Sequence, residues 1–474
     1  MGCRYDRPTV ATGELDPEVT RDLAEAVASA FAADPVGGAV AGLVRDDRLV
    51  WRTAFGHADL QTARPIGLDT VFRAASITKT FTATAVVQLR DAGALRLDDP
   101  LTLHLPEFTA ASNPFGAIED VTLLRLLTHT AGLPVEPPGF DWSQDRYPDT
   151  AAIVAAFDGL ALVVPPDDRM KYSNLGYQLL GEVVSRASGM PYSEAIVRRI
   201  LQPLGMSDTS FDPGAELRDR AATGYDARVF SDDLPRAEER PSSTISDGGL
   251  WTTLADLGRW ASFQLLGDDA VLAPASLAVM HRPHRITDPA WRRAVGLGWY
   301  VHRTDAGVRI GHSGGTFGFV SRIVVDPAER SAAVILANGD APLAPLGDTL
   351  LDLAAGRTDP GSEGTAPAGR PAPVPVPAGV RPLLGLYAWE DLSFVVRVEW
   401  RDGRISIGSG DGPSAREAST LAATEDPFVF VVEGGRSAGE RLTFLRTDQG
   451  EVDGLTLGGW PLPRLVPARA PKPR

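Results

Sequence analysis

One stretch of the chain, residues 356–379, separates two parts with different sequence patterns. It is dominated by proline, glycine, alanine and threonine, a composition that favours an extended linker over a helix or a strand. The chain has 474 residues, of which 43% are hydrophobic, so it can build more than one core. We therefore expect a domain at residues 1–356, a linker at 357–379 and a second domain at 380–474.

The first part mixes helical and strand patterns. Residues 16–31 start with an N-cap and a proline and then repeat an apolar residue at every fourth position, which predicts an amphipathic helix. Strand patterns lie at 39–44 and 49–55 and recur at 295–303, 308–312, 318–325 and 331–337. The region from about residue 98 to 265 is mostly helical in pattern. The expected fold class is therefore α/β, of the α+β kind.

The second part carries short strand patterns between residues 393 and 457. Asp402 and Gly403 separate two of these segments, and this dipeptide is a strong signal for a two-residue hairpin. The pattern predicts a small antiparallel all-β domain, either a barrel or a sandwich.

Composition narrows the range of partners. A formal net charge of -15 argues against nucleic acid or an anionic membrane. Cys3 is the single cysteine, so no intramolecular disulfide or thiolate metal site is expected, and no cofactor is predicted. Residues 1–11 lack the apolar core of a signal peptide, and no apolar stretch reaches membrane-spanning length. We expect a cytoplasmic protein acting on a small molecule or a peptide, with its oligomeric state left open.

Three short motifs indicate the chemistry: S-x-x-K at residues 76–79, Y-x-N at 172–174 and H-x-G at 312–314. Each is weak alone, since Ser76 and Lys79 could be a helix cap and a solvated lysine. Their joint presence in this order indicates a serine acyl-enzyme in which lysine and tyrosine move the proton.

The first motif suits a nucleophile. A helix is predicted from Ser76 to Ala92, and spacing of three places Ser76 and Lys79 on one face of it. The helix start offers backbone N–H groups to an oxyanion. Lysine acts as the base when its surroundings favour the neutral amine, and Tyr172 can relay the same proton.

Residues 311–315 also match G-x-S-x-G, the nucleophile elbow of α/β-hydrolases. That elbow requires a helix after the serine, whereas residues 316–325 have a strand pattern. It also needs a histidine after Ser313, and His312 is the last histidine of the chain. Ser313 is therefore rejected as a nucleophile.

With these motifs the chain resembles the penicillin-binding-protein-like serine hydrolases, the family of class C β-lactamases, D-aminopeptidases and related esterases. The likeness covers roughly residues 36–355 and includes the segments 126–134, 203–206 and 247–251. It implies the β-lactamase/penicillin-binding-protein-like transpeptidase fold, an antiparallel sheet plus a helical subdomain. The C-terminal part resembles the lipocalin-like domain appended to several D-amino-acid peptidases.

The resemblance assigns a role to each motif residue. It implies that Ser76 is acylated, that Lys79 activates it and that Tyr172 shuttles the proton. Asn174 would place the substrate amide and Lys79. His312 stands where β-lactamases carry the lysine of K-T-G, and histidine is mostly neutral near pH 7. This makes efficient β-lactam hydrolysis less expected and fits the D-aminopeptidase and esterase branches.

Four further residues are predicted to bind substrate. Gly314 and Gly315 would allow the close approach of a substrate backbone, and the resemblance places the N–H groups of Ser76 and Gly315 in an oxyanion hole. Trp299 and Phe317, both next to glycines, would line the cleft.

The preferred function is hydrolysis of an amide or ester, with D-amino-acid-containing peptides as candidate substrates. An amine could replace water and make the protein a peptide cyclase, as in penicillin-binding-protein-type thioesterases with the same two-domain layout. A non-catalytic sensor is a third hypothesis, against which the intact Ser76, Lys79 and Tyr172 count. The C-terminal part could cover the site or be a passive appendage.

Overall fold

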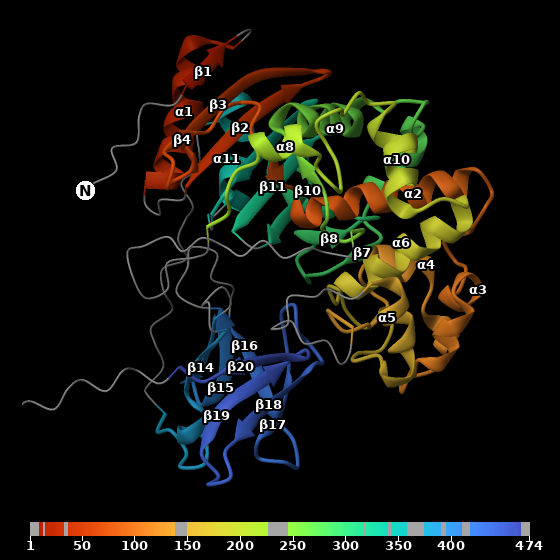
Figure 1. Ribbon diagram of the computed structural model, residues 1–474, viewed down its shortest axis with the longest axis vertical. Coiled ribbons are helices and arrows are strands. Elements are labelled where there is room, and N and C mark those ends of the chain that lie inside the picture. The colour runs from red at the N-terminus through yellow and green to blue at the C-terminus, as the bar shows by residue number, and fades with distance from the viewer. Residues whose placement is uncertain are drawn as a thin grey trace, which may run out of the picture.

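Two large antiparallel sheets organise the protein (Figure 1). The computed structural model describes residues 9–12, 15–32, 37–137, 149–225, 245–316, 318–339, 341, 343–357, 374–389, 395–409 and 418–465. The first sheet uses residues from the first part of the chain and the second sheet uses residues from the C-terminal part. Most of the linker expected at residues 357–379 lies outside the described residues.

The first sheet has the strand order β1-β3-β2-β12-β11-β10-β9-β8-β7, with β4 paired to β3. Its strands are β1 (Thr9–Thr12), β2 (Gly38–Arg45), β3 (Arg48–Asp59), β4 (Arg64–Pro65), β7 (Arg285–Ile286), β8 (Arg293–Val295), β9 (Tyr300–Thr304), β10 (Gly307–Thr316), β11 (Phe319–Asp326) and β12 (Ser331–Ala337). A separate two-stranded sheet pairs β5 (Phe72–Arg73) with β6 (Trp251–Thr252).

Both faces of this sheet are covered by helices (Figure 1). The helices α1 (Pro17–Ala32) and α11 (Leu343–Ala354) pack on one face, and α2 (Thr78–Asp91) and α9 (Leu254–Leu266) lie on the other. Side chains alternate along β2 accordingly, because successive residues of a strand point to opposite faces. Leu43 joins the cluster with α1 and α11, whereas Val44 joins the cluster with α2 and α9.

A helical subdomain fills the middle of the chain. Its helices are α3 (Leu101–His104), α4 (Leu123–Leu127), α5 (Thr150–Ala155), α6 (Asn174–Ser188), α7 (Tyr192–Ile196), α8 (Ala215–Arg220) and α10 (Pro274–His281), with the short turns η2 (Pro106–Ala110), η3 (Ile118–Asp120) and η4 (Phe157–Gly159) and the π-helical turn η5 (Val197–Leu201). The single turn η1 (Ala75–Ile77) directly precedes α2. Helix α6 packs against α2. The predicted sheet and helical subdomain are both confirmed.

The C-terminal sheet forms a nearly closed barrel of eight strands in sequential order. They are β13 (Gly385–Ala388), β14 (Val395–Arg401), β15 (Arg404–Ser409), β16 (Ser419–Ala423), β17 (Val429–Val432), β18 (Arg441–Arg446), β19 (Val452–Leu457) and β20 (Trp460–Pro463), preceded by the turn η6 (Arg381–Leu383). A bridge between Tyr387 and Arg464 brings the two ends together. The predicted hairpin is present, with positive φ angles of 51° at Asp402 and 76° at Gly403.

One strand prediction in the first sheet is wrong. The pattern at residues 295–303 predicted one continuous strand, but it is broken into β8 and β9. Gly298, between them, has φ +78°, and an added Cβ would lie 2.5 Å from Cβ of Ala83 in α2. The break lets the backbone approach that helix.

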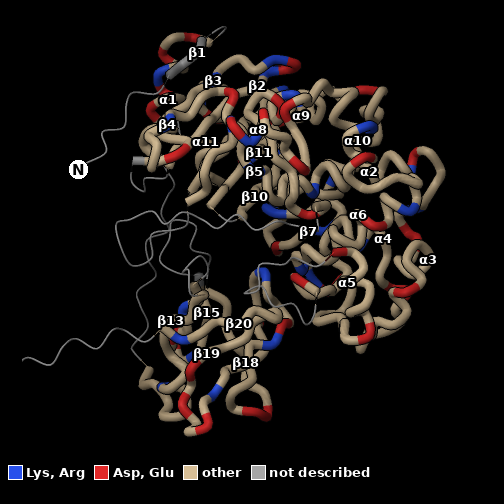
Figure 2. The backbone as a smooth tube through the Cα atoms, viewed as in Figure 1, with Lys and Arg blue, Asp and Glu red and all other residues tan. Residues whose placement is uncertain are grey.

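Charged residues of both signs are spread over both sheet units (Figure 2). Over the described ranges, no helix combines the length and the apolar character needed to cross a membrane.

Candidate active site

Ser76 lies in a strained single turn at the start of α2. The sequence predicted an α-helix from Ser76 onward, but η1 precedes α2, which begins at Thr78. The cause is Ala75, which is buried and has φ +47°, a conformation that costs energy for a residue other than glycine. The Thr78 hydroxyl holds the turn by donating to the Ala75 carbonyl at 2.7 Å. Ser76 is thereby fixed and half-exposed.

The structure brings Lys79 and Tyr172 to the Ser76 hydroxyl. Lys79 Nζ lies 3.2 Å from Ser76 Oγ, and the Tyr172 hydroxyl lies 2.9 Å from the same oxygen. Lys79 is completely buried, whereas Tyr172 is half-buried. Residues 96 positions apart thus meet as the motifs predicted, in a geometry that allows proton transfer at Ser76.

Asp247 holds Lys79 from the other side. Lys79 Nζ donates to the Asp247 backbone carbonyl at 2.6 Å and lies 3.9 Å from its carboxylate. Burial raises the pKa of the Asp247 carboxyl, and the Lys79 charge opposes that rise. Sequence reasoning placed Asp247 in a family-like segment but gave it no role, because the contact joins residues 168 positions apart.

The Tyr172 ring is positioned by His129. The two ring centroids are 4.5 Å apart, and His129 Nδ1 accepts the backbone N–H of Ser173 at 3.2 Å. Burial lowers the pKa of His129 well below its ordinary value, with the nearby Lys79 charge acting in the same direction. A neutral imidazole therefore fixes Tyr172 next to the start of α6.

Asn174 is held by a residue that the sequence did not single out. Its Nδ2 donates to Glu136 Oε1 at 2.5 Å, whereas the resemblance implied that Asn174 places Lys79. Burial raises the pKa of Glu136 to about 8, against opposing effects from Arg436 and Asn174. Within the described residues, Glu136 Oε2 and Asn174 Oδ1 are buried and have no hydrogen-bond partner.

His312 lies on β10 as a buried, neutral side chain. Its Nδ1 donates to the Ser313 carbonyl at 2.7 Å, which leaves Nε2 as an acceptor. Burial, together with the nearby Lys79 charge, lowers the pKa of His312 to about 3. The Tyr300 ring packs 5.2 Å away, centroid to centroid. The site therefore lacks the fixed positive charge that a lysine would supply at this position.

The two glycines after His312 have different surroundings. A Cβ on Gly314 would lie 2.3 Å from both the Ala74 carbonyl and Ser321 Oγ. Gly314 thus allows the Ser76 turn to pack on β10, and its predicted role in substrate binding stays a prediction. Gly315 is exposed, and a Cβ there would meet no atom within 4 Å. Its position remains suited to substrate binding.

Trp299 was predicted to line the substrate cleft, but it is buried in the core. Only 2% of this residue is exposed, and its ring packs in the core with its centroid 5.8 Å from that of His281. The prediction failed because a tryptophan next to a glycine has the same local sequence pattern in a core as in a cleft. Phe317 lies outside the described residues.

The rejected rival nucleophile is part of a strand. Ser313 lies within β10, paired in register with Arg322 of β11, and its hydroxyl accepts from Arg322 Nη1 at 3.2 Å. An elbow serine would instead sit on a strand-to-helix turn.

The C-terminal barrel contacts this site through the loop between β17 and β18, residues 433–440. Glu440 forms a buried ion pair with Lys171, 2.7 Å between Nζ and Oε1, at side-chain exposures of 4% and 0%. The same oxygen accepts the backbone N–H of Val135 at 2.8 Å. Lys171 also donates to the Arg436 carbonyl at 2.8 Å. Since Lys171 precedes Tyr172, the barrel is fastened next to the proposed proton carrier.

Arg436 extends from this loop over the Tyr172 ring. Its Cζ lies 5.1 Å from the ring centroid, and its Nη2 lies 3.4 Å from Glu136 Oε1. A third of the Arg436 side chain is exposed, against 3% for Glu136. These contacts join residues more than 250 positions apart, and no local sequence pattern indicated them. The barrel therefore contributes side chains to the site.

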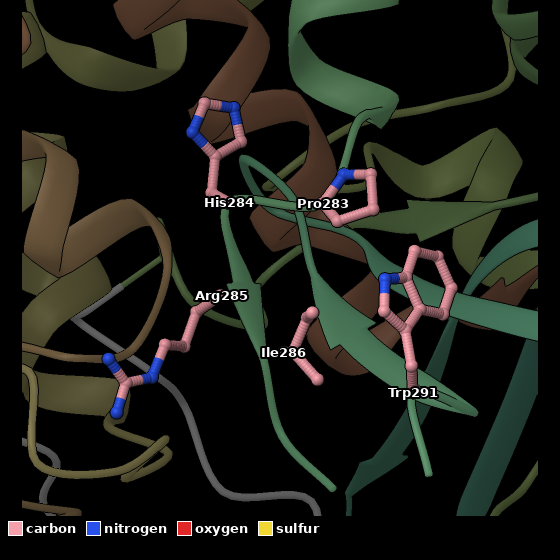
Figure 3. A pocket seen from close by; sticks show the side chains of 5 residues that line it. All are labelled: Pro283, His284, Arg285, Ile286 and Trp291. Carbon is pink, nitrogen blue, oxygen red and sulfur yellow. The ribbon is translucent and has the colours of Figure 1, made fainter. Parts of the chain in front are cut away.

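A separate open hollow of about 560 Å³ lies at the edge strand β7 and the loop that follows it. It is lined by Pro283, His284, Arg285, Ile286 and Trp291 (Figure 3). Arg285 extends away from Pro283 and Trp291 in Figure 3 and donates to the Asp168 carbonyl at 2.8 Å. None of the motif residues lines this hollow, so the chemistry is assigned to Ser76. In the part of the chain that the structure describes, no group of three His, Cys, Asp or Glu side chains is arranged to hold a metal ion.

Known proteins resemble this chain in sequence and in fold. Residues 23–356 match the Beta-lactamase family. Penicillin-binding protein 4 of Amycolatopsis lactamdurans is 31% identical over 370 residues, which cover 75% of this chain and 93% of that protein. The structure of the octameric penicillin-binding protein homologue from Pyrococcus abyssi aligns with a TM-score of 0.62 at 21% identity, over 93% of this chain and 99% of that one. A class C β-lactamase mutant aligns with a TM-score of 0.62 at 20% identity, over 72% of this chain and 97% of its own.

Proposed function

Because the chain belongs to the Beta-lactamase family of penicillin-binding-protein-like serine hydrolases, we propose that it cleaves an amide or ester bond through an acyl-enzyme on Ser76. The observation that carries this proposal is the position of the Ser76 hydroxyl, 3.2 Å from Lys79 Nζ and 2.9 Å from the Tyr172 hydroxyl. A base and a proton donor at one serine are what nucleophilic catalysis needs.

In the proposed acylation step, Ser76 Oγ attacks the acyl carbon of the substrate. The serine proton passes to Lys79 Nζ as the new carbon–oxygen bond forms. The scissile carbon–nitrogen or carbon–oxygen bond then breaks, and the leaving group takes a proton through the Tyr172 hydroxyl.

In the proposed deacylation step, water replaces the leaving group. Tyr172 takes a proton from water as the water oxygen attacks the ester carbon and passes its own proton to Lys79, and Lys79 returns a proton to Ser76 Oγ when the ester bond breaks. The neutral His312 offers Nε2 as a hydrogen-bond acceptor beside this reaction. That feature supports a peptidase or esterase, with D-amino-acid-containing peptides as the candidate substrates, over an efficient β-lactamase.

An amine could take the place of water with the same residues, which would make the product a cyclic peptide. The feature that supports this second candidate is the barrel loop, which packs against Tyr172, the residue that activates the acceptor. Incubation with a peptidyl thioester distinguishes the two: a free acid supports hydrolysis, and a macrocycle supports cyclisation.

The direct test is covalent labelling of Ser76. A fluorophosphonate probe should add one adduct to the intact wild-type protein, as measured by mass spectrometry, and none to Ser76→Ala. The alanine variant should keep the wild-type circular dichroism spectrum, because the substitution removes only a hydroxyl group from a half-exposed side chain. An unlabelled but folded wild-type protein would favour a non-catalytic sensor.

Tyr172→Phe should reduce turnover by at least about 100-fold, because it removes the relay hydroxyl. Phenylalanine keeps the ring between His129 and Arg436, so packing is preserved. The measurement is kcat/KM for a chromogenic ester across pH, with thermal unfolding as the control for folding. A wild-type pH profile in this variant would exclude Tyr172 as the proton carrier.

A further inference from the structure

Building on the proposed function, we propose that Arg436 binds a carboxylate group of the substrate and so determines substrate specificity. The barrel would then supply a cationic subsite to a nucleophile that belongs to the other domain. The substrate class that follows is an ester or peptide with a carboxylate close to the scissile bond.

Contacts of the loop backbone with the catalytic domain hold Arg436 in place. Lys171 donates to the Arg436 carbonyl, and Gly439 of the same loop has φ +80°. A Cβ on Gly439 would lie 2.5 Å from the Val163 carbonyl, so the loop follows the catalytic domain at a distance that only glycine permits. In Figure 2 charged segments of both signs lie where the barrel approaches the α5 and α6 region. The guanidinium is thus presented from a fixed loop.

Among the cations that the structure describes around Ser76, Arg436 is the one that a substrate can reach. Lys79 is completely buried and bound to Asp247. Lys171 is completely buried and paired with Glu440. His312 is neutral because burial lowers its pKa to about 3. Arg436 differs from all of these in that a third of its side chain is exposed.

Glu136 does not cancel the charge of Arg436 near neutral pH. Their contact of 3.4 Å is long for an ion pair, since charge-assisted hydrogen bonds usually span about 2.7–2.9 Å. Burial raises the pKa of Glu136 to about 8, so the carboxyl is mostly protonated at pH 7. That proton gives the unpartnered Glu136 Oε2 a hydrogen to donate, and Asn174 Oδ1 is an acceptor that lacks one.

Guanidinium chemistry specifies the ligand. Arginine offers a planar fork of N–H donors that matches the two oxygens of a carboxylate. The Tyr172 ring lies against one part of this group, so a bound carboxylate would sit one side chain away from Ser76. Binding there would align the scissile bond with the nucleophile and affect both KM and kcat.

The test compares matched substrates that differ in one group. Two sets of chromogenic esters carry the variable group, in one set on the acyl part and in the other on the leaving group. Within each set that group is a carboxylate, a carboxamide or an ammonium. In at least one set, wild-type kcat/KM should be about 10- to 100-fold higher for the carboxylate than for the carboxamide, the size of one charge-assisted contact. Arg436→Gln should reduce that ratio towards one, and Arg436→Lys should keep part of it.

Three results would overturn the proposal. The first is a wild-type ratio of kcat/KM, carboxylate over carboxamide, near one in both sets. The second is an equal loss of kcat/KM on the carboxylate and carboxamide esters in Arg436→Gln. The third is a wild-type preference for the ammonium ester. The last would assign the site to Glu136 Oε2 and Asn174 Oδ1 as acceptors. Fluorophosphonate labelling of the wild type separates these outcomes from failure of the proposed function, because it depends on Ser76 and not on substrate charge.

The pH dependence gives a second readout. The groups that face Glu136 are Arg436, Asp247, Lys79 and Asn174. Below pH 8 the Glu136 carboxyl is neutral and leaves Arg436 to the substrate; above pH 8 it ionises and competes. KM for the carboxylate ester should therefore rise above about pH 8 in the wild type and not in Glu136→Gln. A carboxylate preference that strengthens above pH 8 would contradict this assignment.

Discussion

Replacing Lys79 with methionine should lower the rate of Ser76 acylation by roughly 10⁴–10⁶-fold, the range between loss of a general base and loss of a whole catalytic unit. Lys79 Nζ lies 3.2 Å from Ser76 Oγ, and its removal leaves the serine without a group to take its proton. A single-turnover measurement with a chromogenic ester reports acylation directly.

The methionine variant should still fold. Methionine fills most of the buried volume of lysine, and the pKa of the Asp247 carboxyl is already raised by burial. The Lys79 charge favours the ionised form of this carboxyl, and the variant lacks that charge. The Asp247 carboxyl can therefore stay protonated, so no unpaired charge is buried. Thermal unfolding within a few degrees of the wild type would separate a chemical defect from a structural one. An acylation rate within tenfold of the wild type would show that another group is the base.

The parts of the fold that were predictable depend on local periodicity. The helix α1 follows from apolar residues at every fourth position. Strand β12 has the predicted bounds because its seven residues, six of them apolar, are buried on both faces. The break between β8 and β9 was not predictable, since it arises from the contact of Gly298 with Ala83 in α2. That contact joins residues far apart in the sequence, and strand propensity does not encode it.

In the candidate site, too, the residues of local motifs were predictable and the residues brought in by long-range contacts were not. Ser76 and Lys79 were predicted because they are spaced three positions apart, and Tyr172 because its motif is known from the family. Glu136 and Arg436 were missed, since each is an ordinary charged residue in a loop. Their role depends on where the barrel docks. A Glu or Arg in a linear sequence carries no sign that it will be desolvated by a domain 300 residues away.

Replacing Glu440 with glutamine should destabilise the docking of the barrel by about 3–5 kcal/mol, the usual effect of removing one member of a buried ion pair. Glu440 and Lys171 have side-chain exposures of 4% and 0%, so water cannot replace the lost charge. Burial already lowers the pKa of Lys171, and the Glu440 charge opposes that effect. Loss of this charge leaves Lys171 either ionised without a counter-charge or neutral. Urea unfolding with tryptophan fluorescence measures the change.

Glu399→Gln provides the matched control for this prediction. It is the same substitution in the same barrel, and Glu399 pairs with Arg401 at 2.9 Å, where the Arg401 side chain is 63% exposed. Exposed pairs contribute about 0–1 kcal/mol, so this variant should unfold almost like the wild type. An equal effect of the two substitutions would mean that the Glu440 pair does not fasten the barrel.

The Glu440 variant also tests whether the barrel takes part in the chemistry. Glu440 contacts Lys171 and Val135, and it has no contact with Ser76 among the interactions of the described residues. Loosening the loop should nevertheless move Arg436 away from Tyr172, so kcat/KM for a carboxylate ester should fall more than the rate of fluorophosphonate labelling. Because the probe carries no carboxylate, equal losses in both assays would indicate general disruption of the Ser76 site. A selective loss would show that the barrel acts on substrate binding through Arg436.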